Sequence, residues 1–404
     1  MPRIALLDNL VKEYAWGSRT FIPRLLGKPF PSAKPQAELW MGAHPRGTSR
    51  VLWEGRWLPL SDLIKKDPQG MLGKAAASKY SKQIPFLFKV LAASTPLSIQ
   101  AHPNQAQAAE GFERESREGI PLTAPYRNYL DSSHKPEMIC ALTPFWALKG
   151  FRSVNEIRST LRGIGFSAAE IFYSEGEGEK ATRKIFTSLF TMEREKQKRL
   201  VSDLVSAAVA QSSSDPVCEW ISRLQEHFPN DMGVFGPVLL NLIRLEPGDA
   251  LSISAGELHS YLDGSGIEVM ANSDNVLRAG LTKKHVDVHE LLKALSFLPD
   301  QTKILRPRPQ GPAECLYPKG AEEFTLSRIT LERGLVYQSP LKRSIEIMIC
   351  VQGEAEVSDV ETGEILALIR GTSIMVPALV KGYRLAGAGT LYKAAVPLEE
   401  SPGD

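Results

Sequence analysis

The chain has 404 residues, which is enough for two or three domains rather than a single core. Its 43% hydrophobic and 23% charged residues are typical of a globular protein, and its net charge of +2 gives no strong field toward nucleic acid or an acidic membrane surface. The four cysteines are scattered and form no CxxC pair, which argues against a disulfide framework and a cysteine zinc site.

Residues 1–152 are rich in short β-type runs that Gly and Pro interrupt. The clearest of these runs are VLW at 51–53, PFLFKVLAA at 85–93, LSIQAH at 97–102, PEMICAL at 136–142 and FWALKGF at 145–151. Short, closely spaced strands with turn residues between them predict a sandwich or a barrel.

Residues 153–235 have a helical texture instead. VNEIRSTLRGIG, KATRKIFTSLF and MEREKQKRLVSDLVSAAVAQ carry helical spacing, and the last has an apolar stripe made of Leu200, Val201, Leu204, Val205 and Ala208. We therefore predict a helical insertion that interrupts a β unit.

Strand texture returns over residues 236–290 and continues over 291–404, with one short connecting helix at HVDVHELLKALSF. We expect residues 1–152 and 236–290 to form one barrel and residues 291–404 to form a second. EPGDALSISAGELHSY and IRGTSIMVPALVKGYR resemble each other, and only the first contains a histidine, His259. This is the pattern of a duplicated barrel that keeps a metal site in one copy, and chance similarity between two hairpins is the competing explanation.

Candidate metal ligands lie in the β-type runs. Strict alternation in LSIQAH places Ser98, Gln100 and His102 on one face of a strand. HKPE adds His134 and Glu137, and AGELHSY adds His259. Two imidazoles, a carboxylate and an amide oxygen could hold one divalent ion.

Ordinary structural roles compete with this interpretation. Gln100 and His102 also fit a half-exposed strand pair, Glu137 fits a surface ion pair, and His259 fits a turn. Spacing alone leaves both interpretations open.

Four stretches resemble the type I phosphomannose isomerases, a family of zinc enzymes built from cupin barrels. The stretches are AELWMGAHP from Ala37, PFLFKVLAASTPLSIQAHPN from Pro85, NYLDSSHKPEMICAL from Asn128 and ISAGELHSYLDGSGIEVMANSDNVLRAGLTKK from Ile253. The resemblance implies a mainly β fold with two cupin, jelly-roll-like barrels and an inserted α-helical domain. It also implies one Zn²⁺ per chain and interconversion of mannose 6-phosphate and fructose 6-phosphate.

Position by position, the resemblance implies that the zinc ligands are Gln100, His102, Glu137 and His259. The family's active-site arginine falls on Arg278, its carboxylate near the sugar on Glu268, and its substrate-facing lysines on Lys135 and Lys284. The family's GLTPK is replaced by Gly280-Leu281-Thr282-Lys283-Lys284 here, and the loss of proline is expected to loosen the turn that presents Lys284.

An aldose–ketose isomerase needs a base, an acid and positive charge beside a developing enediolate. We expect Glu268 to be the base, with Lys135 and His134 as rivals, and Arg278 to stabilise the enediolate. Ser98 and Lys284 are candidates for binding the phosphate. A structural ion pair between Glu268 and Arg278 is the competing interpretation, and we assign Glu38 and Trp16 to packing.

Two other functions are compatible with the residues. One is an Fe²⁺-dependent cupin oxygenase, and the other is a non-catalytic double cupin that binds a sugar. The expected partner is a small sugar phosphate, with no nucleic acid and no membrane. The N-terminal apolar run is too short for a signal peptide and no stretch reaches membrane-spanning length, so we expect a cytoplasmic protein that acts as a monomer.

Overall fold

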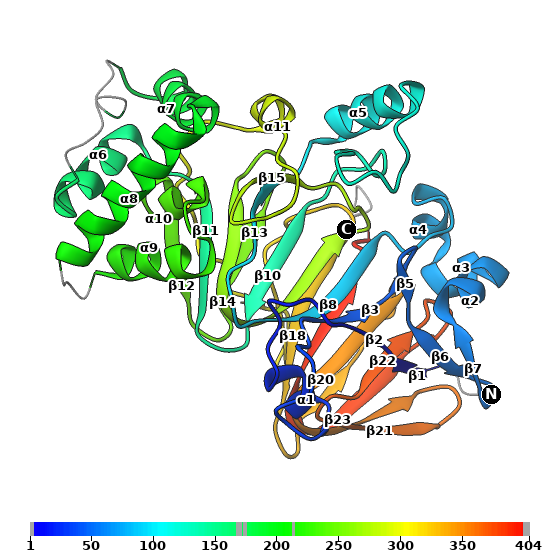
Figure 1. Cartoon of the computed structure of the whole chain (residues 1–404). Coiled ribbons are helices and arrows are strands. Elements are labelled where there is room, and N and C mark those ends of the chain that lie inside the picture. The colour runs from blue at the N-terminus through cyan, green and yellow to red at the C-terminus, as the bar shows by residue number, and fades with distance from the viewer. Residues whose placement is uncertain (1–3, 167–171, 173–175, 212–214, 399–404) are drawn as a thin grey trace.

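Two large β-sheets and a group of helices on one flank make up the protein (Figure 1). The computed structural model describes residues 4–166, 172, 176–211 and 215–398. The predicted mainly β fold with a helical insertion is confirmed. Closure of each sheet into a barrel stays a prediction.

The first sheet has ten strands and carries the candidate metal ligands. Its centre is β14, which pairs with β8, β9, β10 and β11. Strands that precede the helical insertion in the sequence and strands that follow it therefore share one sheet. The strands are β2 (Leu10–Lys12), β3 (Glu38–Met41), β8 (Phe86–Ala93), β9 (Ile99–Ala101), β10 (Glu137–Ala141), β11 (Phe145–Phe151), β12 (Leu240–Leu245), β13 (Ala250–Ile253), β14 (His259–Ala271) and β15 (Leu277–Gly280).

The second sheet has eleven strands and is mostly C-terminal. Its members are β1 (Ala5–Asp8), β6 (Arg50–Trp53), β7 (Arg56–Pro59), β16 (Arg308–Pro309), β17 (Glu314–Leu316), β18 (Thr325–Leu331), β19 (Val336–Gln338), β20 (Glu346–Asp359), β21 (Ile365–Ile369), β22 (Ser373–Val376) and β23 (Tyr383–Ala395). A separate pair is formed by β4 (Ala43–His44) and β5 (Gly47–Thr48).

The start of the chain crosses the predicted division between the β units. β1 pairs with β22 on one side and with β6 on the other, so it belongs to the second sheet. Ala5 and Leu7 alternate with less buried neighbours and bury their side chains in a core that both sheets share. That shared core, which also holds Val90 and Ile347, explains why an N-terminal strand completes the C-terminal sheet.

The helical insertion packs against the back of the first sheet. Its elements are α6 (Val154–Gly163), α7 (Glu179–Thr191), α8 (Arg194–Ala210), α9 (Pro216–His227), the 3-10 helix η2 (Met232–Phe235) and α10 (Gly236–Leu239). One apolar cluster joins these helices to Ile99, Ala101 and Leu148 of the sheet. No helix among the described residues is long and apolar enough to cross a membrane.

Helices within residues 1–152 were absent from the prediction. They are α1 (Phe21–Leu25), α2 (Leu60–Lys66), α3 (Pro68–Leu72), α4 (Lys74–Lys79) and α5 (Gln105–Arg117). Four of them are too short to show a helical period. The fifth, α5, begins at an Asn104–Gln107 capping box, a signal that the sequence did offer. α11 (Val288–Ala294) is the predicted connecting helix.

The helical insertion holds the turn that follows β15. Asp231 Oδ1 accepts hydrogen bonds from the backbone N–H of Gly233 at 2.7 Å and of Leu281 at 2.8 Å. Gly233 and Gly280 lie so close that a Cβ on either would meet backbone atoms of the other segment at 2.7–2.9 Å. This contact fixes the backbone just after Arg278.

We expect Asp231→Ala to lower the free energy of unfolding by about 1–3 kcal/mol, because it leaves buried backbone donors without an acceptor. Urea denaturation followed by circular dichroism measures the change. Asp203→Ala on the exposed face of α8 is the control, with an expected change of less than about 0.5 kcal/mol. An equal effect of the two substitutions would contradict the assignment of this contact.

Candidate metal centre and its cavity

The ends of three strands place the candidate metal ligands. Gln100 lies in β9 directly opposite His259, the first residue of β14. His102 follows the end of β9, and Glu137 is the first residue of β10. Glu137 lies opposite Ile253, the last residue of β13, and residues 254–258 lead from there to His259, so ligands far apart in sequence come together.

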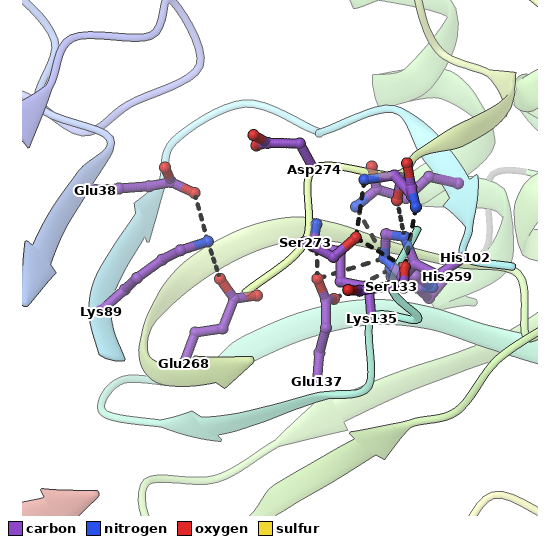
Figure 2. Close-up of polar contacts among 12 residues, drawn as sticks. Glu38, Lys89, His102, Ser133, Lys135, Glu137, His259, Glu268, Ser273 and Asp274 are labelled. Atoms are coloured by element: carbon purple, nitrogen blue, oxygen red, sulfur yellow. Dashed lines mark hydrogen bonds and ion pairs between the residues drawn. The ribbon is translucent and has the colours of Figure 1, made fainter. Parts of the chain in front are cut away.

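Three of these side chains face one another with their ligand atoms all within 4.8 Å. His102 Nε2 lies 3.3 Å from Glu137 Oε1, and His259 Nε2 lies 3.4 Å from Glu137 Oε2. All three side chains are buried (Figure 2). His102 Nε2 and Glu137 Oε2 nevertheless form no hydrogen bond, which is costly for buried polar atoms.

Backbone carbonyls fix the orientation of both imidazoles. His102 Nδ1 lies 2.7 Å from the Asn275 carbonyl oxygen, and His259 Nδ1 lies 3.0 Å from that of Glu257. Because a carbonyl only accepts, each Nδ1 carries the proton and each Nε2 turns its lone pair toward Glu137. This is the arrangement that metal-binding histidines use.

Asn275 is itself held on several sides. Its side chain accepts from the Leu130 N–H at 2.7 Å and donates to the carbonyl oxygens of Asp131 and Ser133 at 2.8 and 2.9 Å. The loop before Glu137 and the loop before Arg278 are thereby tied together behind His102.

The charge state of the cluster suits a cation. Burial and the neighbouring Lys135 ammonium lower the pKa of His102 to about 4, so that it is neutral at pH 7. Burial alone raises the pKa of Glu137, but the Lys135 ammonium opposes it, and that pKa lies well below its usual value. Lys135 Nζ lies 3.0 Å from Glu137 Oε1.

The spacing of the ligand atoms fits zinc. Ligands held tetrahedrally at about 2.0–2.1 Å from Zn²⁺ stand about 3.3–3.4 Å apart, close to the two separations around Glu137. Gln100 Nε2 lies 3.4 Å from His259 Nε2, so its oxygen becomes a fourth ligand only after the amide flips.

A cavity of about 500 Å³ opens beside this cluster. The predicted site residues that line it are Ser98, Gln100, Lys135, Glu137, Glu268, Arg278 and Lys284. Phe228 of the helical insertion also lines it, as do Leu281 and Lys284, which follow Arg278. The insertion thus contributes part of the cavity wall.

Lys89 is a cavity residue that the sequence analysis missed. Its buried ammonium lies 2.8 Å from Glu268 and 3.5 Å from Glu38, and Figure 2 shows it between the two carboxylates. The competing interpretation expected an ion pair between Glu268 and Arg278. The structure pairs Glu268 with Lys89 instead. A single lysine inside the apolar run FLFKVLAA was the available signal, since a buried lysine requires a partner.

The packing role assigned to Glu38 and Trp16 is incomplete, because both line the cavity. His134, the other rival for the base, lies elsewhere. It is not among the lining residues, and its Nε2 lies 2.8 Å from Glu323 Oε1 in the C-terminal region. The structure therefore does not bring His134 together with Glu268 and Lys135.

Comparison with known proteins gives a consistent result. Residues 4–154 match the family description "Phosphomannose isomerase type I, catalytic domain" and residues 166–240 match "Phosphomannose isomerase type I, helical insertion domain". Mannose-6-phosphate isomerase of Salmonella typhimurium is 39% identical over 96% of this chain and 98% of its own length. The Homo sapiens protein of that name is 35% identical over 93% of this chain and 94% of its own length.

Solved structures agree. A crystal structure of a mutant phosphomannose isomerase from Salmonella typhimurium has a TM-score of 0.91 and 37% identity, covering 98% of this chain and all of that one. A zinc-bound crystal structure of mannose 6-phosphate isomerase has a TM-score of 0.90 at 37% identity, with the same coverage. Similarity at this level and over this length shows that the chain belongs to the type I phosphomannose isomerase family.

Proposed function

We propose that this chain is a zinc-dependent isomerase that interconverts mannose 6-phosphate and fructose 6-phosphate. The observation that carries the proposal is the group of buried, unsatisfied ligand atoms on His102, Glu137 and His259 beside a cavity rich in cations. The full-length relatives are mannose-6-phosphate isomerases, and one similar structure is zinc-bound.

His102, Glu137, His259 and, after the amide flip, Gln100 would hold the zinc ion. With one carboxylate among its ligands, a bound Zn²⁺ would keep about one net positive charge, which would polarise the oxygens of the sugar. The short Lys135–Glu137 contact fixes that carboxylate in place.

Glu268 is the proposed base that moves a proton between the two carbons. Burial raises the pKa of Glu268 above its ordinary value, although the contact with Lys89 works in the opposite direction. A carboxylate with a raised pKa accepts and returns a proton more readily near neutral pH. Lys89 keeps Glu268 directed into the cavity, and Lys135 is the alternative proton carrier.

Arg278 is proposed to stabilise the enediolate, since a guanidinium stays charged at any working pH. Lys284 would bind the phosphate together with Ser98. Burial lowers the pKa of Lys284, and the like charges of Arg278 and Arg46 lower it further. Arg46, Arg278 and Lys284 all line the cavity, and their positive charges favour a dianionic phosphate.

The proposal keeps the predicted organisation except in the N-terminal region, where β1, β6 and β7 belong to the second sheet. The rest of residues 1–152 and residues 236–290 form the catalytic unit, residues 153–235 the helical insertion, and residues 291–404 the main part of a second β unit without metal ligands. It also keeps a monomer in the cytoplasm that acts on a small sugar phosphate.

Removing the metal is expected to abolish isomerisation, because the positive charge at the ligand cluster would be lost. The test is a coupled assay with mannose 6-phosphate on chelator-treated protein, before and after Zn²⁺ is returned, with metal analysis of each sample. Full activity in a verified metal-free sample would refute the ligand assignment. Restoration by Fe²⁺ but not Zn²⁺, with consumption of O₂, would favour the oxygenase.

Glu137→Gln is expected to lower zinc affinity at least about tenfold, since the only carboxylate of the cluster becomes neutral. Zinc per chain after dialysis, measured by mass spectrometry, reports the loss. Glu323→Gln, which removes the partner of His134 outside the cavity, is the matched control and should keep its zinc. A full zinc content in Glu137→Gln would count against this ligand.

Arg278→Ala is expected to retain zinc and the fold but to lower kcat about 10²–10³-fold, because the enediolate loses the positive charge that stabilises it. Steady-state kinetics and zinc analysis of the same preparation test this. Arg244→Ala on the exposed edge strand β12 should leave kcat unchanged. A drop of less than about threefold in Arg278→Ala would move the catalytic role to another residue.

A further inference from the structure

A second cavity, of about 620 Å³, lies in the C-terminal β unit and plays no part in the proposed reaction. Residues of β17, β18, β19, β20 and β23 line it. Four of its lining side chains are ionisable and have little exposure in the structure, namely Glu314, Arg343, Glu346 and Lys393. Charges withdrawn from water in this way are expensive to bury, which makes the cavity more than a gap in packing.

Strand register shows that this cavity corresponds to the first one. β10 pairs with β13 and β14, and β20 pairs with β22 and β23 in the same pattern. Glu137 lies opposite both Ile253 and Met270, and Glu346 lies opposite both Val376 and Ala395. Glu346 therefore occupies the register position of Glu137.

The same register places the other charged residues. Glu268 lies opposite Lys89 across β14 and β8, and Lys393 lies opposite Ser327 across β23 and β18. One strand further, Glu38 of β3 corresponds to Glu314 of β17. Every member of these corresponding pairs lines its own cavity.

Both units have a buried cluster of one lysine and two glutamates, but the lysine lies on β8 in the first unit and on β23 in the second. Lys89 bridges Glu38 and Glu268 in the first unit, whereas Lys393 lies 2.8 Å from Glu314 and 3.3 Å from Glu346 in the second. Lys393 also donates to the Tyr337 hydroxyl at 3.0 Å.

A metal ion does not fit the second cavity. No histidine or cysteine is among its lining residues, and the strand that begins with His259 in the first unit begins with Tyr383 in the second. Both carboxylates are already paired with cations, since Arg343 Nη1 lies 3.1 Å from Glu346 Oε2. These residues therefore exclude a metal ion as the ligand of this cavity.

The balance of charge favours a neutral ligand. The buried side chains of Lys393 and Arg343 match Glu314 and Glu346, and the exposed Lys342 adds a single positive charge to the wall. The first cavity instead has a surplus of cations, with Arg46, Lys283 and Lys284 in its wall. The second cavity therefore offers no comparable cluster for a phosphate.

Hydroxyl groups suit the remaining features. Carboxylate oxygens accept from hydroxyls, and Arg343 Nε is a buried donor without a partner. Leu316, Val336 and Tyr337 add apolar surface for the C–H face of a ring. We propose that the C-terminal cavity is a second binding site, which takes a neutral polyhydroxylated molecule of the size of a hexose.

The test uses D-mannose as the probe and the zinc-loaded full chain as the protein. Ala395→Met and Leu316→Trp fill the second cavity with the side chains that Met270 and Trp40 place at the corresponding positions of the first. Neither substitution alters an ionised group. Ala388→Met, on an exposed part of β23 outside this cavity, is the matched control.

We expect wild type and Ala388→Met to bind mannose saturably in equilibrium dialysis, and hydrogen exchange to slow in peptides covering residues 314–331. Each filling variant should raise the Kd for mannose at least about tenfold, that is by about 1.4 kcal/mol, while kcat with mannose 6-phosphate stays unchanged. Two variants are used so that the misfolding of one leaves the test intact.

Absence of saturable mannose binding would overturn the proposal. So would binding that both filling variants leave unchanged, or protection confined to peptides of the first cavity. Stronger protection of the peptides covering residues 314–331 by inorganic phosphate than by mannose would overturn the neutral-ligand assignment. These outcomes are separate from isomerase activity, so a failure here leaves the proposed reaction standing, and a failure of the reaction leaves this site standing.

Discussion

The structure depends on one buried carboxylate, that of Glu137, which stands between two imidazoles and an ammonium group. Such a group stays ionised inside a protein only where positive charge surrounds it. His102 and His259 supply lone pairs rather than protons, because backbone carbonyls hold their Nδ1 hydrogens. The cluster therefore suits a cation, and a cation held there would lie beside the cavity that Gln100 and Glu137 line.

The rest of the molecule serves to hold that geometry. Asn275 ties two loops together behind His102, and Asp231 ties the helical insertion to the backbone beyond Arg278. The shared core explains why β1 completes the C-terminal sheet, since the two sheets bury their apolar faces against each other. The C-terminal unit repeats the strand register of the first and keeps its buried charges, but it lacks the imidazoles among the residues that line its cavity.

Sequence patterns predicted the parts of the fold that follow simple periodicity. FWALKGF coincides with β11, and the stripe around Leu204 lies in α8. The helices α2 to α4 were not predicted, because each has only five to seven residues, too few to show a helical period. The ligand residues were identified from residue type and resemblance together. Lys89 was missed because its role depends on strand pairing with Glu268 across 179 residues, which no local pattern encodes.

Anomalous diffraction at the zinc absorption edge, from crystals of the zinc-loaded protein, tests the central claim most directly. The expected map holds one strong peak per chain, about 2.0–2.2 Å from His102 Nε2, His259 Nε2 and a Glu137 oxygen, with the Gln100 amide oxygen turned toward it. A peak at another place in the chain, or none at these side chains in protein that is fully active, would contradict the account.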